Sequence, residues 1–250
     1  MKLGKLAPKF NPKTLKLSKY LAAPANVLPA PPPKSYWEYR IPADAWQMFG
    51  NDTIGDCTCA CIAHMLMNVT AHTGKIVVPT LQDVISVYSA VSGYDPSTGE
   101  NDNGAAITDV LAYWQATGIS GHRILGWASL DAGNVQHVEQ GNYIFGGVDI
   151  GFNVPQSAMD QTNAQQSWDV VSPDGGIIGG HSVPIFGYGS QGATCITWGA
   201  LQQMGWPFFS KYCDEAYVVV TQDWLNQADG LAPSGFDLTA LQADLKAIAV

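Results

Sequence analysis

The stretch that decides the fold is Asn51-Asp52-Thr53-Ile54-Gly55-Asp56-Cys57, followed by Thr58-Cys59-Ala60-Cys61-Ile62-Ala63-His64-Met65-Leu66-Met67. It predicts a glycine-turned loop that leads into a buried helix over about 57–72, because small and apolar residues continue without Pro or Gly until Gly74. A cysteine at a helix start meets unpaired backbone N–H groups and the positive end of the helix dipole, and both favour the thiolate. The alternative for Cys57 is a small buried core residue.

Composition limits the class of protein. The 250 residues are 46% hydrophobic and include eight Trp, which is typical of a globular chain with one large core or two joined halves. A formal charge of −9 argues against a nucleic-acid partner. Residues 1–20 hold no continuous apolar run and no segment reaches ~18 apolar residues, so we expect no signal peptide, no transmembrane segment and no membrane partner. A cytoplasmic location is favoured.

The five cysteines do not form an obvious disulfide or metal framework. They lie at positions 57, 59, 61, 195 and 213, an odd number with three on one helix. Residues i and i+2 of a helix point to different faces, so Cys57 and Cys59 cannot share one tetrahedral ion with His64. The loop 93–104 lacks the regular spacing of a calcium loop. We therefore expect no metal and no cofactor, and core roles for Cys59 and Cys61.

The chain divides into an arm and one domain. Residues 1–35, rich in Lys and Pro, predict an extended arm. Residues 36–250 predict an α+β domain with a helical half over about 45–120, a β-rich half over about 121–222 and a C-terminal helical tail over 223–250. Further helices are expected over 80–92 (capped by Thr80 and ended by Gly93), 105–117, 156–168 and 237–250, and strands over 143–152, 181–188, 193–198 and 216–221.

A base would have to accompany the cysteine. His181 is the best candidate, since Gly179-Gly180-His181-Ser182-Val183 places it at a strand start among small neighbours. His64 lies two turns along the cysteine's own helix, about 10 Å away at 1.5 Å per residue. The other histidines lie in polar or turn contexts.

The combined pattern resembles the papain-like cysteine peptidases over about residues 45–222. That family has an amide side chain, three residues, Gly, one residue and then the nucleophile; this chain has Asn51, Gly55 and Cys57. Its Asn-Gly-Gly turn before a helix ending in Gly-Ile is matched by Asn103-Gly104-Ala105 and Gly118-Ile119. Its His-Ala-Val, three residues, Gly-Tyr-Gly and later Trp-Gly are matched by His181-Ser182-Val183, Gly187-Tyr188-Gly189 and Trp198-Gly199.

The resemblance implies a fold with an active groove between the two halves, and peptide-bond hydrolysis through a thioester. Cys57 would be the nucleophile, His181 the base, and Asn51 an oxyanion donor beside the backbone N–H of Cys57. It implies that Gly104 and Ala105 bind the substrate backbone. It also implies that the substrate site is lined by further residues: Val148, Ile150, Ser182 and Trp198.

Two positions depart from the family pattern. Asn51 stands where the family has Gln and is one methylene shorter. The family's histidine-orienting Asn lies two residues before the Trp, where this chain has Ile196. Counted from His181, Thr197 falls at the matching distance, and its hydroxyl can accept from an imidazole N–H. The catalytic set is then Cys57, His181, Asn51 and Thr197.

Two other functions stay open: a papain-like binding or structural protein without turnover, and a deamidase or transamidase that uses the same nucleophile. The expected partner is a peptide or protein substrate. Relatives are often made with an inhibitory prosegment, and the 56 residues before Cys57 are too few for a full one. We expect the arm to cover part of the groove or to mediate self-association.

Overall fold

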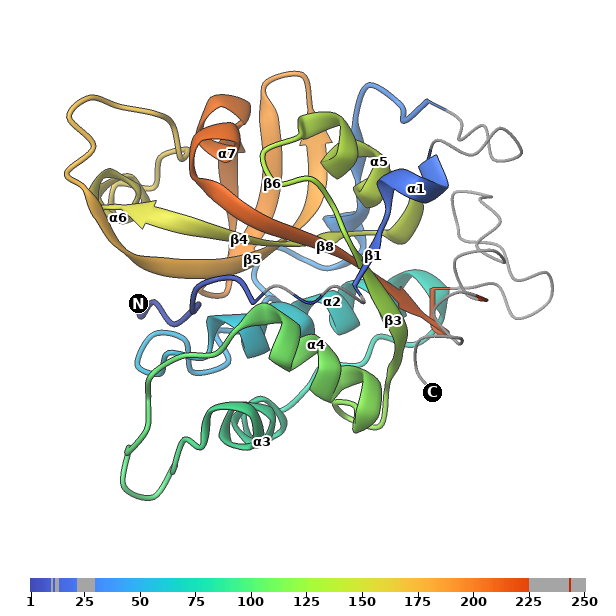
Figure 1. Ribbon diagram of the computed structural model, residues 1–250, viewed down its shortest axis with the longest axis vertical. Helices are drawn as coiled ribbons and strands as arrows, with labels where there is room; N and C mark the ends of the chain where they lie inside the picture. Colours follow the sequence, from blue (N-terminus) through green and yellow to red (C-terminus); the bar gives the residue numbers. More distant parts are fainter. Residues whose placement is uncertain (10, 12–13, 22–29, 225–242, 244–250) are drawn as a thin grey trace.

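The computed structural model describes residues 1–9, 11, 14–21, 30–224 and 243. The expected helix over 237–250 and most of the tail over 223–250 lie outside these residues. One side of the molecule is helical, and the other contains the sheet together with further short helices (Figure 1). No helix within the described ranges has the length and apolar character needed to cross a bilayer.

The helical half is built around α2 (Cys57–Thr73), with α3 (Leu81–Ser92) and α4 (Ile107–Ala116) beside it. Helix α2 is buried from Cys57 to Thr70, as its unbroken small and apolar sequence predicts. Helix α3 begins with a capping box in which the Thr80 side chain accepts from the Asp83 N–H, and it ends at Gly93 in the left-handed conformation. The expected helices over 57–72, 80–92 and 105–117 are confirmed.

The β-rich half is one sheet with the strand order β1-β3-β8-β4-β5-β6-β7, and β2 also pairs with β5. The strands are β1 (Leu15–Lys16), β2 (Ser35–Tyr36), β3 (Ile124–Ser129), β4 (Val148–Pro155), β5 (Ile177–Gly189), β6 (Gly192–Thr197), β7 (Ala200–Gly205) and β8 (Cys213–Thr221). All pairs are antiparallel except β1 with β3. The shorter helical elements are α1 (Ser18–Leu21), η1 (Trp37–Arg40), α5 (Val135–Phe145), α6 (Gln156–Asn163) and α7 (Trp206–Tyr212).

The strand expected over 143–152 is wrong in its first part. Helix α5 continues through Phe145 and ends at Gly146, whose φ of 76° is left-handed, and β4 begins only at Val148. Asn134 caps this helix by accepting from the His137 N–H. The aromatic and β-branched residues at 143–145 read as strand, yet Ile144 and Phe145 are buried from the helix, so tertiary packing overrides their β propensity.

Each half of the molecule has its own apolar core. One packs around α2, α3 and α4 and includes Trp114; the other lies on the β side and includes Phe152 and Trp168. The long strand β5 contacts α2, so the cysteine helix and the histidine strand meet where the two halves join. The fold is α+β, as the sequence predicts.

Candidate active site

Cys57 is the first residue of α2 and lies against the opposite half of the molecule. Its thiol is 1% exposed, and the backbone of Ser182, the residue after His181 on β5, hydrogen-bonds to the sulfur. Asp56 stands at the N-cap position, but its side chain makes no capping hydrogen bond. The sulfur therefore lies beside both the helix start and the strand that carries the histidine.

One hydrogen bond and two aromatic side chains hold the imidazole of His181. Its Nε2 lies 2.7 Å from Thr197 Oγ1 at the end of β6, and Trp198 stacks on the ring at a centroid distance of 4.5 Å and an angle of 15°. Phe152 of β4 meets the ring edge-on at 5.8 Å. In the part of the chain that the structure describes, Nδ1 of His181 is buried and has no hydrogen-bond partner. When Thr197 accepts from Nε2–H, Nδ1 is left as the basic atom.

Burial keeps the cysteine and histidine uncharged in this state. It raises the pKa of the Cys57 thiol to about 12, with hydrogen bonds from the backbones of Ser182 and Gly4 opposing that rise. Burial also lowers the pKa of His181 to about 3. A thiolate–imidazolium pair would carry two charges that this closed environment does not solvate. The thiol and the neutral ring are therefore the species present near pH 7.

Asp56, which the sequence reasoning did not single out, adds to this effect. Its carboxyl is fully buried beside Asn51, and burial raises its pKa to about 8, so it is largely protonated at pH 7. Any charge it does carry also raises the pKa of the adjacent Cys57 thiol. An acidic residue directly before Cys57 is visible in the sequence, but its protonation depends on burial.

Asn51 lies near the start of α2 with its amide already bonded. Its Nδ2 donates to the carbonyl oxygens of Ile54 at 3.1 Å and of Lys2 at 3.2 Å. The first of these contacts fixes the turn that leads to Cys57. The second is made to the N-terminal arm. The side chain suggested as an oxyanion donor therefore already binds the Lys2 carbonyl of the same chain.

Residues 1–6 run between the two halves of the molecule. Ala105 of the helical half donates to Gly4 O at 2.9 Å and accepts from Leu6 N at 3.0 Å, a parallel β-bridge centred on Lys5. On the β side, the N–H groups of Gly4 and Lys5 both donate to Gly180 O, at 3.2 and 3.0 Å. Figure 1 shows this dark-blue segment between α2 and the sheet. We call the space that residues 1–6 occupy the groove.

The arm fits the groove so closely that glycine is required both in the arm, at Gly4, and in the groove, at Gly104. A Cβ at Gly4 would lie 1.9 Å from Gly55 O, and a Cβ at Gly104 would lie 2.0 Å from Gly4 O. Gly104 also has a φ of +84°, which side chains rarely adopt. Of the two residues that the resemblance assigns to substrate-backbone binding, Ala105 thus hydrogen-bonds to the backbone of the arm and Gly104 packs against it.

Lys5 is a deeply buried residue of the arm. Its side chain is 1% exposed, and Nζ lies 3.0 Å from a carboxylate oxygen of Asp214 and 3.1 Å from Oε1 of Glu215. The same Nζ donates to Leu6 O at 3.2 Å. A Cβ at Gly151 of β4 would lie 2.0 Å from Lys5 Cε, so the stem passes directly over this glycine. Lys5, Gly151, Asp214 and Glu215 are all residues that the sequence reasoning missed.

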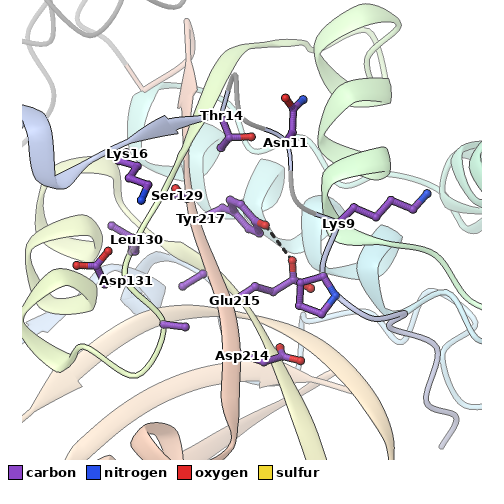
Figure 2. Close-up of a pocket in the computed structure, with 13 residues that line it drawn as sticks. Lys9, Asn11, Thr14, Lys16, Ser129, Leu130, Asp131, Asp214, Glu215 and Tyr217 are labelled. Atoms are coloured by element: carbon purple, nitrogen blue, oxygen red, sulfur yellow. Dashed lines mark hydrogen bonds between the residues drawn. The ribbon is translucent and has the colours of Figure 1, made fainter.

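The two acidic residues also border a cavity of about 530 Å³ between the arm and strands β3 and β8. Figure 2 shows Glu215 in this cavity joined to Tyr217, whose hydroxyl donates to Oε2 at 2.9 Å, with Asp214 nearby on the same strand. Lys9 and Lys16 of the arm also line the cavity, and Figure 2 shows them on opposite sides of Tyr217. Asp214 and Glu215 therefore both pair with Lys5 and contribute to the wall of this cavity.

The remaining predicted substrate residues have different positions. Ser182 is buried, and its hydroxyl donates to Asp149 Oδ1 at 2.8 Å, a carboxyl whose pKa burial raises to about 7. Val148 and Ile150 are fully buried in the β-side core. Trp198 covers His181 and borders a second cavity, of about 510 Å³, which also includes Met1 and Thr197. The position that the family pattern gives to an orienting Asn is Ile196, which is buried in the helical-side core.

The structure thus brings Cys57, Asn51, Gly104, Ala105 and Ser182 around the arm, with the Thr197–His181–Trp198 group beside Ser182 on β5 and β6. Their catalytic and binding roles stay predictions. Among the described residues, no three His, Cys, Asp or Glu side chains gather as a metal site.

Comparison with known proteins identifies the fold. The sequence matches no family model and no curated protein. Among solved structures, it is similar to xylellain, a cysteine protease from Xylella fastidiosa, with a TM-score of 0.66 and 15% identity over 88% of this chain and 96% of that one. It is also similar to procathepsin B S9 from Trypanosoma congolense, with a TM-score of 0.60 and 10% identity over 88% and 86%.

A third similar structure is the Carica candamarcensis cysteine protease CMS1MS2 in complex with E-64, with a TM-score of 0.54 and 13% identity over 76% of this chain and 98% of that one. The agreement extends over nearly the whole of the xylellain and CMS1MS2 chains. The fold is therefore that of the papain-like cysteine peptidases, as the four sequence motifs predict.

Proposed function

We propose that this protein is a cysteine peptidase that hydrolyses peptide bonds through a thioester on Cys57. The observation that carries the proposal is the contact between the Cys57 sulfur and the backbone of Ser182, because it brings the nucleophile against the residue next to His181 on the facing half. Papain-like architecture and the buried, unbonded Nδ1 of His181 support the same assignment.

In the proposed mechanism, His181 takes the thiol proton of Cys57 and the thiolate attacks the scissile carbonyl carbon. The oxyanion receives the backbone N–H of Cys57 and Nδ2 of Asn51. His181 then gives its proton to the leaving amine, and the amine departs with the C-terminal part of the substrate. Water attacks the thioester, with His181 taking one proton from it, and regenerates the thiol with release of the acid. Thr197 holds the ring through Nε2.

This chemistry requires residues 1–6 to leave the groove. They hold the backbone groups of Ala105 and Gly180 and the Asn51 amide. They also contribute to the burial that keeps Cys57 and His181 uncharged, since the backbone of Gly4 contacts the sulfur. We infer that the state with the arm in place is latent and that displacement of the arm permits the ion pair to form.

A non-catalytic scaffold is the second candidate, and the occupied groove together with Ile196 at the family's Asn position favours it. Labelling with a thiol-directed peptidyl epoxide separates the two. The peptidase predicts label on Cys57 in full-length protein carrying Gly4→Ala, and none in the same protein carrying Cys57→Ala. An unlabelled Cys57 in the folded Gly4→Ala protein would contradict an enzyme that uses Cys57 as its nucleophile.

Peptide cleavage then separates a hydrolase from an enzyme that modifies side-chain amides. A mixed peptide digest incubated with the Gly4→Ala protein is analysed by mass spectrometry for new termini and for deamidated Gln or Asn. New termini that disappear with Cys57→Ala support the peptidase. Deamidation or cross-linking without new termini assigns the nucleophile to a deamidase or transamidase.

A further inference from the structure

The clearest unassigned feature of the groove is the pocket around the Lys5 side chain, and its interpretation rests on the proposed function. The pocket is formed by Asp214 and Glu215 of β8 at its end and by Gly151 of β4 along its wall. We call these three residues the acidic pocket. The side chain of Lys5 crosses Gly151 and ends between the two carboxyl groups.

The acidic pocket needs a cation. Glu215 is 5% exposed and neighbours Asp214, which adds a second negative charge, and the buried Asp149 carboxyl is close enough to interact electrostatically with both Lys5 and Glu215. Tyr217 satisfies one oxygen of Glu215, whereas the other faces Lys5 Nζ. An apolar side chain in the same place would leave the buried Glu215 carboxyl, and Asp214 beside it, without this positive partner, which is costly.

The main-chain contacts of residues 1–6 do not select a sequence, and a second charge pair of this segment, Lys2 with Asp102, leaves the Lys2 side chain 41% exposed. Ala105 and Gly180 bind the arm through main-chain N–H and C=O groups, which every peptide presents. Within the groove, the Lys5 side chain is the buried and charge-paired group that depends on residue type. Because Gly151 has no side chain, the pocket wall admits the full length of a lysine stem.

We propose that the acidic pocket is the specificity pocket of the enzyme, that it selects peptide substrates with Lys or Arg at the position that enters it, and that Lys5 is its intramolecular occupant. Either basic side chain can meet the two carboxyl groups, since arginine and lysine both carry a positive charge at the end of a long stem. The arm and a basic substrate then compete for the same two carboxyl groups.

The test uses full-length protein with Gly4→Ala and Lys5→Ala, which removes the Lys5 anchor and creates the Gly4 clash with Gly55 O. Binding is measured by isothermal titration calorimetry with Cys57→Ala added, so that no turnover is needed. The probes are a synthetic peptide of residues 1–9 and the same peptide with norleucine in place of Lys5. We expect the lysine peptide to bind at least about tenfold more tightly, the scale of one lost buried charge pair.

The pocket variants are Glu215→Gln and Asp214→Asn. Asp214 is partly exposed, so its substitution is the less demanding of the two for folding. Each should reduce the preference for lysine over norleucine, whereas Asp109→Asn, which removes only the exposed partner of Lys9, should preserve it. Thermal unfolding shows whether each pocket variant folds. If one does not, the peptide preference of the other pocket variant decides the test. Equal affinity for the two peptides, or a preference that both folded pocket variants retain, would overturn the proposal.

Turnover is measured separately with Cys57 intact, on fluorogenic peptides in which each position in turn carries Lys, Arg or norleucine. Preference for Lys and Arg at one position, lost in the pocket variants, supports the proposal. Cleavage without a basic preference at any position refutes it while the peptidase assignment stands. Lysine-selective binding without cleavage supports the pocket and removes the peptidase assignment.

Discussion

Thr197 Oγ1 lies 2.7 Å from Nε2 of His181, across the neighbouring strands β5 and β6. A hydroxyl thus meets the imidazole at the position that, counted from His181, corresponds to the amide of the family pattern. The contact needs no charge, and the stacked indole of Trp198 keeps it away from solvent. It is the structural feature on which the proposed orientation of the base depends.

We expect Thr197→Val to lower kcat roughly 10²-fold in the Gly4→Ala protein, because a valine of similar shape cannot hold the imidazole by a hydrogen bond and general-base catalysis contributes at least this much. Thr197→Ser keeps the hydroxyl and should retain most of the activity. Steady-state kinetics on one fluorogenic peptide provides the comparison. A fully active Val variant would show that His181 is oriented by packing alone.

Gly4→Ala should expose the nucleophile, since a Cβ at this position would lie 1.9 Å from Gly55 O and backbone atoms would have to separate. Relief of burial lowers the Cys57 pKa from about 12, and each unit of that fall raises the thiolate fraction about tenfold at neutral pH. We expect iodoacetamide to alkylate Cys57 at least about tenfold faster. Gly74→Ala is the control, because a Cβ there meets nothing within 4 Å.

That comparison is made by mass spectrometry of the Cys57 peptide over a range of pH. The pH at which alkylation is half-maximal should move to lower values in Gly4→Ala and stay in place in Gly74→Ala. Identical profiles for the two variants would show that residues 1–6 do not control the protonation of the thiol.

Asn51→Ala should reduce turnover by roughly 10²–10³-fold in the Gly4→Ala protein, the cost of one oxyanion donor. Asn51→Gln keeps the amide and extends it by one methylene, so it should retain more activity than the alanine variant. Because Asn51 Nδ2 also donates to Ile54 O, the unfolding midpoint is measured alongside. An alanine variant that is folded and turns over at the parental rate would remove Asn51 from the oxyanion site.

The stability of the folded protein should fall as pH rises from 6.5 to 8. Burial raises the pKa of Asp56 to about 8, so the folded state retains a proton that the unfolded state has already released. Each such proton contributes a slope of up to about 1.4 kcal/mol per pH unit. The buried histidines His64 and His181 have lowered pKa values, and their effect is confined to pH below about 6.5.

Asp56→Asn removes this ionisable group and should make the fall in the urea midpoint between pH 6.5 and 8 shallower. Asp44→Asn changes an exposed carboxyl and serves as the control with the parental slope. An Asp56→Asn protein whose midpoint falls as steeply as that of the parent would show that Asp56 is ionised in the folded state.

Local signals were sufficient for the helical half. The start of α2 follows from Gly55 and the cysteine run, and the bounds of α3 follow from the Thr80–Asp83 capping box and Gly93. Such signals depend on neighbours within one helical turn, which the sequence displays directly. The strand expected from residue 143 was wrong because local propensity was overridden by packing. Residues 143–145 are helical, and the helix buries Ile144 and Phe145 in the core.

The sequence by itself determined the order and spacing of the groups that the fold brings together, from Asn51 and Cys57 to His181 and Thr197. Only the tertiary structure decided what surrounds them: Lys5 lies 209 residues before Asp214 in the chain, yet the two are paired in space. It also decided that Cys57 and His181 are uncharged, because desolvation depends on the complete set of neighbours rather than on residue type. Spacing is a property of the chain, whereas burial and pairing across the groove exist only once the arm and both halves are packed together.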